Sequence, residues 1–155
     1  MCGIVGLFLK DKSLEPKLGK MLTEMLITMT DRGPDSAGIA IYSEETIGRA
    51  KMTVQSDARE SAFKGLDTVL SEAISASVSM QVRSTHAILD IPTGSTADVR
   101  SELTKLGIRV MSRGNNLEIY KEVGLPQDVA AQFDITTMSG SHGIGHTRMA
   151  TESAV

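Results

Sequence analysis

The chain of 155 residues carries 16 Lys and Arg against 19 Asp and Glu, a formal net charge of −3 at pH 7. This mildly acidic balance does not suit a partner bound through phosphates, so we expect no nucleic-acid partner. With 41% hydrophobic and 23% charged residues, the composition is that of a globular domain and excludes a disordered or fibrous chain. An aromatic content of 3% leaves few side chains on which bases could stack.

Membrane and secretion signals are not found in the sequence. The longest apolar run, residues 1–9, is followed by Lys10-Asp11-Lys12 and falls short of the roughly 18–20 residues that cross a bilayer. It also has neither the basic start nor the cleavage site of a secretory signal. We therefore expect a cytoplasmic protein with no membrane partner. The single cysteine, Cys2, can form neither an internal disulfide nor a thiolate metal cluster.

In chain order, the first expected element is a buried strand over residues 1–8. Residues 18–29 predict a helix, which a Gly-Pro pair ends, because apolar side chains recur there at helical spacing: Leu18, Met21, Leu22, Met25, Leu26 and Met29. A loop over residues 32–38 and a second buried strand over residues 39–42 follow. Residues 63–74 carry another helical stripe.

The middle of the chain contains a compact unit over residues 83–122, which we interpret as a small β-α-β-β insertion. Its first strand is expected over residues 86–91, where the sequence is apolar and β-branched. Its helix is expected over residues 96–106, with Ser95 and Asp98 spaced as a capping pair.

Two further strands are expected over residues 108–112 and 117–120, and the turn Gly114-Asn115-Asn116 predicts that they form a hairpin. A short helix begins near Pro126, because proline suits the first turn of a helix. A glycine-rich stretch over residues 139–146 precedes the end of the chain.

Cys2 directly follows the initiator methionine, and such a small side chain is expected to let Met aminopeptidase expose it as the new amino terminus. The residue then carries both a thiol and a free α-amine. An α-amine has a reference pKa of about 7.7–8.0, so near neutral pH its unprotonated form can take the thiol proton while the sulfur attacks a carbonyl. The alternative for a lone cysteine is a small buried hydrophobe. Its position and two further motifs favour the nucleophile.

These two motifs combine groups that suit a binding site. Arg32-Gly-Pro-Asp-Ser-Ala-Gly38 brings a guanidinium, a carboxylate and a hydroxyl into a tight loop, although an ordinary helix-cap turn carries the same Gly-Pro signal. Residues 143–151 are expected to include a strand that carries Arg148, with the hydroxyls of Thr147 and Thr151 near it. A guanidinium suits fork-like recognition of a carboxylate, as on a free amino acid, or a surface salt bridge.

Together with Met1-Cys-Gly-Ile-Val-Gly6, these motifs resemble, in this order, the start of the class II glutamine amidotransferase domain, an N-terminal-nucleophile hydrolase. The resemblance covers about residues 1–55 and 122–155. It implies an α+β fold, the αββα four-layer sandwich of two antiparallel sheets between helices. Residues 1–155 would form the front part of this domain, with residues 83–122 inserted in it.

The resemblance also implies a reaction and a set of site residues. Cys2 attacks the side-chain amide of glutamine, releases ammonia and leaves a glutamyl thioester that water hydrolyses. Carried over by motif, Arg148 binds the glutamine α-carboxylate and Thr151 lines the pocket. Arg32 and Gly33 shape the pocket around the thiol. No cofactor and no metal are implied.

Within the family, the motifs are most similar to those of the amidotransferase-like subunit of split glutamate synthase or N-methylglutamate synthase. The implied partners are glutamine and synthase subunits that take the ammonia. The family's Asn-Gly oxyanion pair lies beyond the third motif, so we expect little or no glutaminase turnover from the 155-residue chain alone. The alternative is a catalytically weak or inactive regulatory or assembly subunit of such a complex, docked through residues 83–122.

Two rival sites receive less support from the sequence. His142 and His146 have the i, i+4 spacing of a helical metal site, but such a site needs a third ligand, and the intervening glycines argue against a helix. A phosphate-binding loop at residues 140–145 lacks the lysine and the following helix.

Overall fold

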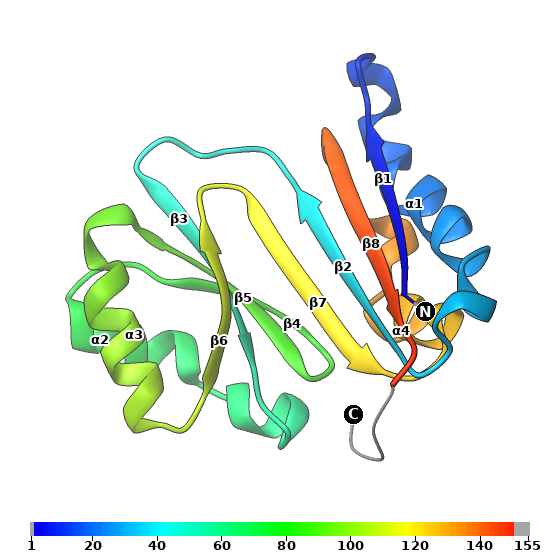
Figure 1. Ribbon diagram of the computed structural model, residues 1–155. Coiled ribbons are helices and arrows are strands. Elements are labelled where there is room, and N and C mark those ends of the chain that lie inside the picture. The colour runs from blue at the N-terminus through cyan, green and yellow to red at the C-terminus, as the bar shows by residue number, and fades with distance from the viewer. Residues whose placement is uncertain (1, 151–155) are drawn as a thin grey trace. The chain divides into compact units, whose positions relative to one another are not determined.

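The computed structural model describes residues 2–150. Within them the chain is α+β, with four α-helices and two four-stranded antiparallel sheets (Figure 1). It divides into two compact units, one formed by the residues up to Glu44 and from Ile119 onward, the other by Glu45–Glu118. The expected α+β class with two antiparallel sheets is confirmed.

The first unit is built on the sheet that contains β1. Its strands lie in the order β1 (Gly3–Phe8), β8 (His142–Arg148), β2 (Ser36–Tyr42) and β7 (Leu117–Val123). One face of this sheet is covered by α1 (Leu18–Ile27) and α4 (Pro126–Gln132), as Figure 1 shows. The predicted first strand and both predicted helices are confirmed, whereas β2 begins inside the expected loop, at Ser36.

Close approach of α1 to the sheet depends on glycines in β8. The side chains of Leu22 and Leu26 are completely buried on the helix face that meets the sheet. A Cβ on Gly143 would lie 2.8 Å from Cδ2 of Leu22, and one on Gly145 would lie 2.8 Å from Cδ1 of Leu26. The two glycines therefore admit the leucines that form the core of the first unit.

The second unit contains the other sheet and its own pair of helices. Its strands lie in the order β4 (Ser79–Arg83), β5 (His86–Pro92), β3 (Arg49–Gln55) and β6 (Arg109–Gly114). The helices of this unit are α2 (Leu66–Ile74) and α3 (Thr96–Lys105). Along the chain the elements follow as β-α-β-β-α-β, the order of the split βαβ or ferredoxin-like motif.

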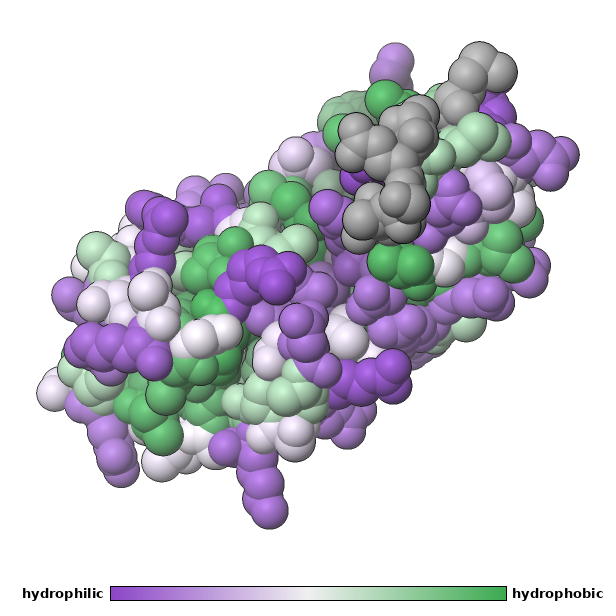
Figure 2. Space-filling view, turned by 60° about the horizontal axis from the view of Figure 1, so that its bottom comes forward, coloured by the Kyte–Doolittle hydropathy of each residue, from purple (hydrophilic) through white to green (hydrophobic). Residues whose placement is uncertain are grey.

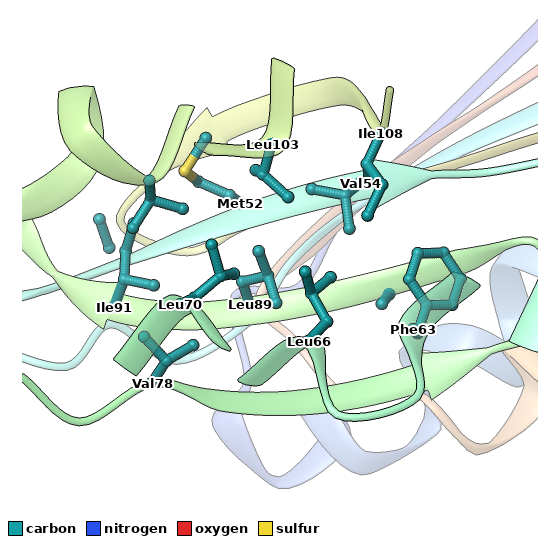
Figure 3. Close-up of a cluster of buried hydrophobic side chains, with 13 residues drawn as sticks. Met52, Val54, Phe63, Leu66, Leu70, Val78, Leu89, Ile91, Leu103 and Ile108 are labelled. Atoms are coloured by element: carbon teal, nitrogen blue, oxygen red, sulfur yellow. The ribbon is translucent and has the colours of Figure 1, made fainter. Parts of the chain in front are cut away.

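A separate hydrophobic core holds the second unit together. Alternate residues of β3 point into it, namely Ala50, Met52 and Val54. Figure 3 shows the cluster, in which side chains of α2, α3 and the strands meet; among them are Leu66, Leu70, Leu89, Ile91 and Leu103. Each of these side chains is at most 3% exposed, and every residue of the cluster belongs to Glu45–Glu118.

Two expectations for the middle of the chain are corrected. The predicted hairpin is wrong, because β6 pairs with β3 and β7 lies beside β2 in the other sheet. The Gly114-Asn115-Asn116 turn thus leads from one sheet to the other. The compact unit is also larger than the expected insertion at residues 83–122: it begins at Glu45, since β3 is an interior strand of its sheet.

The start of α3 differs in detail from the expected capping pair. Ser95 is the N-cap residue, but its side chain makes no capping hydrogen bond. Instead, the Thr96 hydroxyl donates to the carbonyl oxygen of Thr93 at 3.3 Å. Gly107 follows the end of the helix, with a φ of +69° that favours glycine.

The outer surface carries many polar side chains. Figure 2 shows hydrophilic residues over much of the visible face, with apolar residues between them. Within residues 2–150, no helix combines the length and the apolar character that crossing a membrane would require.

We predict that residues 45–118 fold when produced alone. Leu70→Ala should lower the free energy of unfolding of this unit by about 2–5 kcal/mol, because it removes a fully buried side chain. The matched control Val69→Ala, on the same helix at a side chain 48% exposed, should change it by less than about 0.5 kcal/mol. Urea unfolding followed by circular dichroism measures both. The prediction would be contradicted if Leu70→Ala and Val69→Ala lowered the free energy of unfolding equally, or if residues 45–118 produced alone were unfolded.

Candidate functional site

The three sequence motifs meet at one end of the first sheet. β8 lies between β1 and β2 and runs antiparallel to both, with Gly3 opposite Thr147 and Ser36 opposite Arg148. The start of β1, the start of β2 and the end of β8 are therefore adjacent (Figure 1). Cys2 immediately precedes β1, and its side chain is exposed at this end of the sheet.

The residue after Cys2 is held in a tight backbone contact. A Cβ on Gly3 would lie 2.8 Å from Oγ1 of Thr147 and 3.0 Å from Cβ of Met29. Thr147 is completely buried, and its hydroxyl donates to the carbonyl oxygen of Met29 at 3.2 Å. This hydrogen bond joins Met29, which follows α1, to β8 next to the start of β1.

The second motif packs against the backbone of the third. Gly33 is extended, and a Cβ on it would lie 2.5 Å from the nitrogen and 2.6 Å from the carbonyl carbon of Arg148. Pro34 forms a parallel bridge with Arg148. Arg32 precedes this contact and is exposed. The contact requires glycine at position 33 because no side chain fits between the two segments.

Asp35 makes the hydrogen bonds that join this loop to its surroundings. Its backbone N–H donates to the carbonyl oxygen of Arg148 at 3.1 Å, and its Oδ2 accepts from the N–H of Ala150 at 2.7 Å. Its carbonyl oxygen accepts from the N–H of Gly124 at 2.9 Å. The motif contains this carboxylate, but local sequence gives no sign that its partner lies 115 residues away.

Arg148 is exposed, whereas its neighbour Thr147 is buried against the helix side of the sheet. Because successive side chains of a strand point to opposite faces, Arg148 lies on the face away from α1. The structure thus brings Cys2, Arg32, Gly33 and Arg148 to one end of the sheet. Thr151 lies outside the described residues.

The two histidines of the rival metal site lie on β8 rather than on a helix. Four residues apart in a strand, His142 and His146 are separated by about 13 Å along the backbone, too far to share one ion. His142 instead stacks on Tyr42 with ring centroids 4.0 Å apart, and its Nδ1 lies 2.9 Å from the hydroxyl of Ser141. Residues 2–150 contain no cluster of three or more His, Cys, Asp or Glu side chains that could hold a metal.

The chain is similar over its whole length to curated proteins whose names refer to glutamine amidotransferases. It is 59% identical over 157 residues to the glutamine amidotransferase-like protein GlxB of Rhizobium meliloti (strain 1021), of which it covers 52%. It is 30% identical over 172 residues to a putative glutamine amidotransferase of Methanothermobacter thermautotrophicus, of which it covers 54%. The chain thus spans about half the length of these relatives, and no protein-family model matches it.

We predict that Gly33→Ala destabilises the first unit by about 1–3 kcal/mol, because the new methyl group meets the backbone of Arg148. Gly6→Ala is the matched control: it lies on β1 with nothing within 4 Å of the new Cβ, and we expect its stability to be unchanged or slightly higher. Thermal unfolding followed by circular dichroism compares the two variants. Equal stability of both would show that the contact at Gly33 relaxes without cost.

Proposed function

We propose that the chain forms the front part of a class II glutamine amidotransferase domain that hydrolyses glutamine and delivers the ammonia to a partner synthase. The observation that carries the proposal is the meeting of the three motifs around the exposed Cys2 at one end of the first sheet. Glutamine itself is proposed from the names of the relatives, both of which are described as glutamine amidotransferases or as similar to them.

In the proposed reaction, removal of Met1 exposes the α-amine of Cys2. This amine takes the thiol proton as the sulfur attacks the side-chain amide carbon of glutamine. The tetrahedral intermediate collapses with cleavage of its C–N bond, and the leaving nitrogen takes the proton and departs as ammonia. Water then attacks the glutamyl thioester, releasing glutamate and restoring the thiol.

The proposed binding roles follow from the chemistry of the side chains. The planar guanidinium of Arg148 can hold both oxygens of the glutamine α-carboxylate, and its exposure leaves it accessible to a ligand. Arg32 and Gly33 shape the pocket beside Cys2, where Gly33 already contacts the backbone of Arg148. Thr151 is proposed as a further lining residue on the motif alone.

The αββα sandwich is proposed for the complete domain. The face of the first sheet away from α1 and α4 carries exposed apolar side chains, with Ile4 72%, Phe8 67% and Ile144 45% exposed. These residues lie on neighbouring strands, since Ile144 pairs with Gly6, midway between Ile4 and Phe8 on β1. An apolar sheet face of this kind supports a further layer packed against it.

A second candidate is a weak or inactive amidotransferase-like subunit with a regulatory or assembly role in a glutamate-synthase-like complex. The observation that favours it is the second unit, which has a hydrophobic core of its own, whereas all the residues named for the proposed site belong to the first unit. Such a unit suits docking to a partner. Glutamine hydrolysis separates the two candidates, because only the first requires it.

We predict that the full-length protein with its synthase partners hydrolyses glutamine and that Cys2→Ala abolishes this. Alanine is small enough for Met1 to be removed, so the variant changes the nucleophile and not the processing. Intact-mass measurement should find Met1 absent, and a glutamine-like electrophile should add once, on the amino-terminal cysteine. Activity that persists in Cys2→Ala, or active protein that retains Met1, would contradict the mechanism.

We predict that Arg148→Lys in the full-length protein raises the KM for glutamine about 10-fold or more and changes kcat far less. A point charge then replaces a two-pronged donor, at a cost of about 1.5–3 kcal/mol. The matched control is Arg109→Lys on β6, an exposed arginine of the second unit, which should leave KM unchanged. An unchanged KM in Arg148→Lys would remove Arg148 from the binding site.

A further inference from the structure

We propose that Asp35 is a positioning residue for glutamine binding, which acts through Arg148 by holding the backbone that directly follows the Cα of Arg148. This inference rests on the proposed function. Asp35 bonds twice to this segment, once through its backbone N–H to the carbonyl oxygen of Arg148 and once through Oδ2 to the N–H of Ala150.

The Asp35 carboxylate accepts a hydrogen bond just beyond the last paired residues of β2 and β8. Ser36 opposite Arg148 is the last pair between β2 and β8, and β8 ends at Arg148. Beyond this pair, the N–H of Ala150 meets a side chain instead of a strand: Oδ2 of Asp35 accepts it at 2.7 Å. Asp35 therefore holds the carbonyl group of Arg148 and the N–H group of Ala150, which are the backbone groups on either side of Met149.

Asp35 is itself well anchored. Its carbonyl oxygen accepts from the N–H of Gly124, which directly follows β7. Gly33, two residues earlier, packs on the Arg148 backbone without space for a methyl group. The loop that carries the carboxylate is therefore held between β7 and β8, and it can act as a rigid support for the segment that follows Arg148.

Rigid support matters because Arg148 is long and exposed. A flexible guanidinium loses side-chain freedom when it clamps a carboxylate, and any freedom of its backbone adds to that cost. A hydrogen bond between an amide and an ionised carboxylate is stronger than one between neutral groups, so a single side chain can restrain the segment. A merely structural aspartate would affect stability alone, whereas a positioning residue affects the KM for glutamine.

The experiment compares three variants of the full-length protein with its partners: Asp35→Ala, which removes the acceptor, Asp35→Asn, which keeps an oxygen that can accept, and Asp35→Ser as a replacement if Asp35→Ala does not fold. We expect Asp35→Ala to raise the KM for glutamine about 10-fold with kcat within about 2-fold, and Asp35→Asn to restore most of the affinity. Combined with Arg148→Lys, Asp35→Ala should add little further, because both act on one contact.

Several results would overturn the proposal: additive effects in the double variant, no rescue by Asp35→Asn, or a fall in kcat at unchanged KM. Amide hydrogen exchange of Ala150 gives a readout independent of activity. It should speed up in Asp35→Ala and stay slow in Asp35→Asn, and unchanged exchange in Asp35→Ala would also overturn the proposal. If the unmodified protein binds no glutamine, both the proposed function and the role of Asp35 in glutamine binding are wrong. Amide exchange of Ala150 separately tests whether Asp35 holds the backbone after Arg148.

Discussion

The central strand β8 pairs with β1 along one edge and with β2 along the other, and this double register places Arg148 beside the start of β1, which Cys2 precedes, and the start of β2. A slip of one residue would turn Thr147 outward and Arg148 toward α1, because side chains alternate between the faces of a sheet. The glycines oppose such a slip. Gly143 and Gly145 leave room for Leu22 and Leu26 of α1. After a slip of one residue, bulkier residues of β8 would face these leucines and clash with them.

Local patterns in the sequence predicted the elements whose signal is strong. The leucine and methionine stripe of α1, the proline at the start of α4 and the apolar run of β5 all gave elements within a few residues of the observed bounds. Two strands were not predicted. β3 alternates apolar and polar residues clearly enough to have been found, whereas β4 is a short edge strand with mostly exposed side chains and offers little pattern.

Long-range pairing was beyond the reach of local patterns. The turn before β7 has the residues of a hairpin, yet β7 lies beside β2, whose last residue, Tyr42, is far upstream in the chain. The same limit applies to the site. The motifs identified Cys2, Gly33 and Arg148 as candidates, but the bond between Asp35 and Ala150 links two motifs through space and is seen only once the strands are paired.

The path of the chain explains how the first sheet accommodates so large an insertion. The start of β2 and the end of β7 lie at the Cys2 end, as the bond between Asp35 and Gly124 requires. The chain therefore leaves the sheet after Tyr42 and returns at Leu117, at the opposite end of these strands. Their length separates the two ends by roughly 20 Å, at about 3.3 Å per residue. The inserted unit has a hydrophobic core of its own, and the strands whose pairing assembles the three motifs, β1, β8 and β2, all belong to the first unit. The β2 to β7 connection can thus acquire an independent unit without disturbing the register around Arg148.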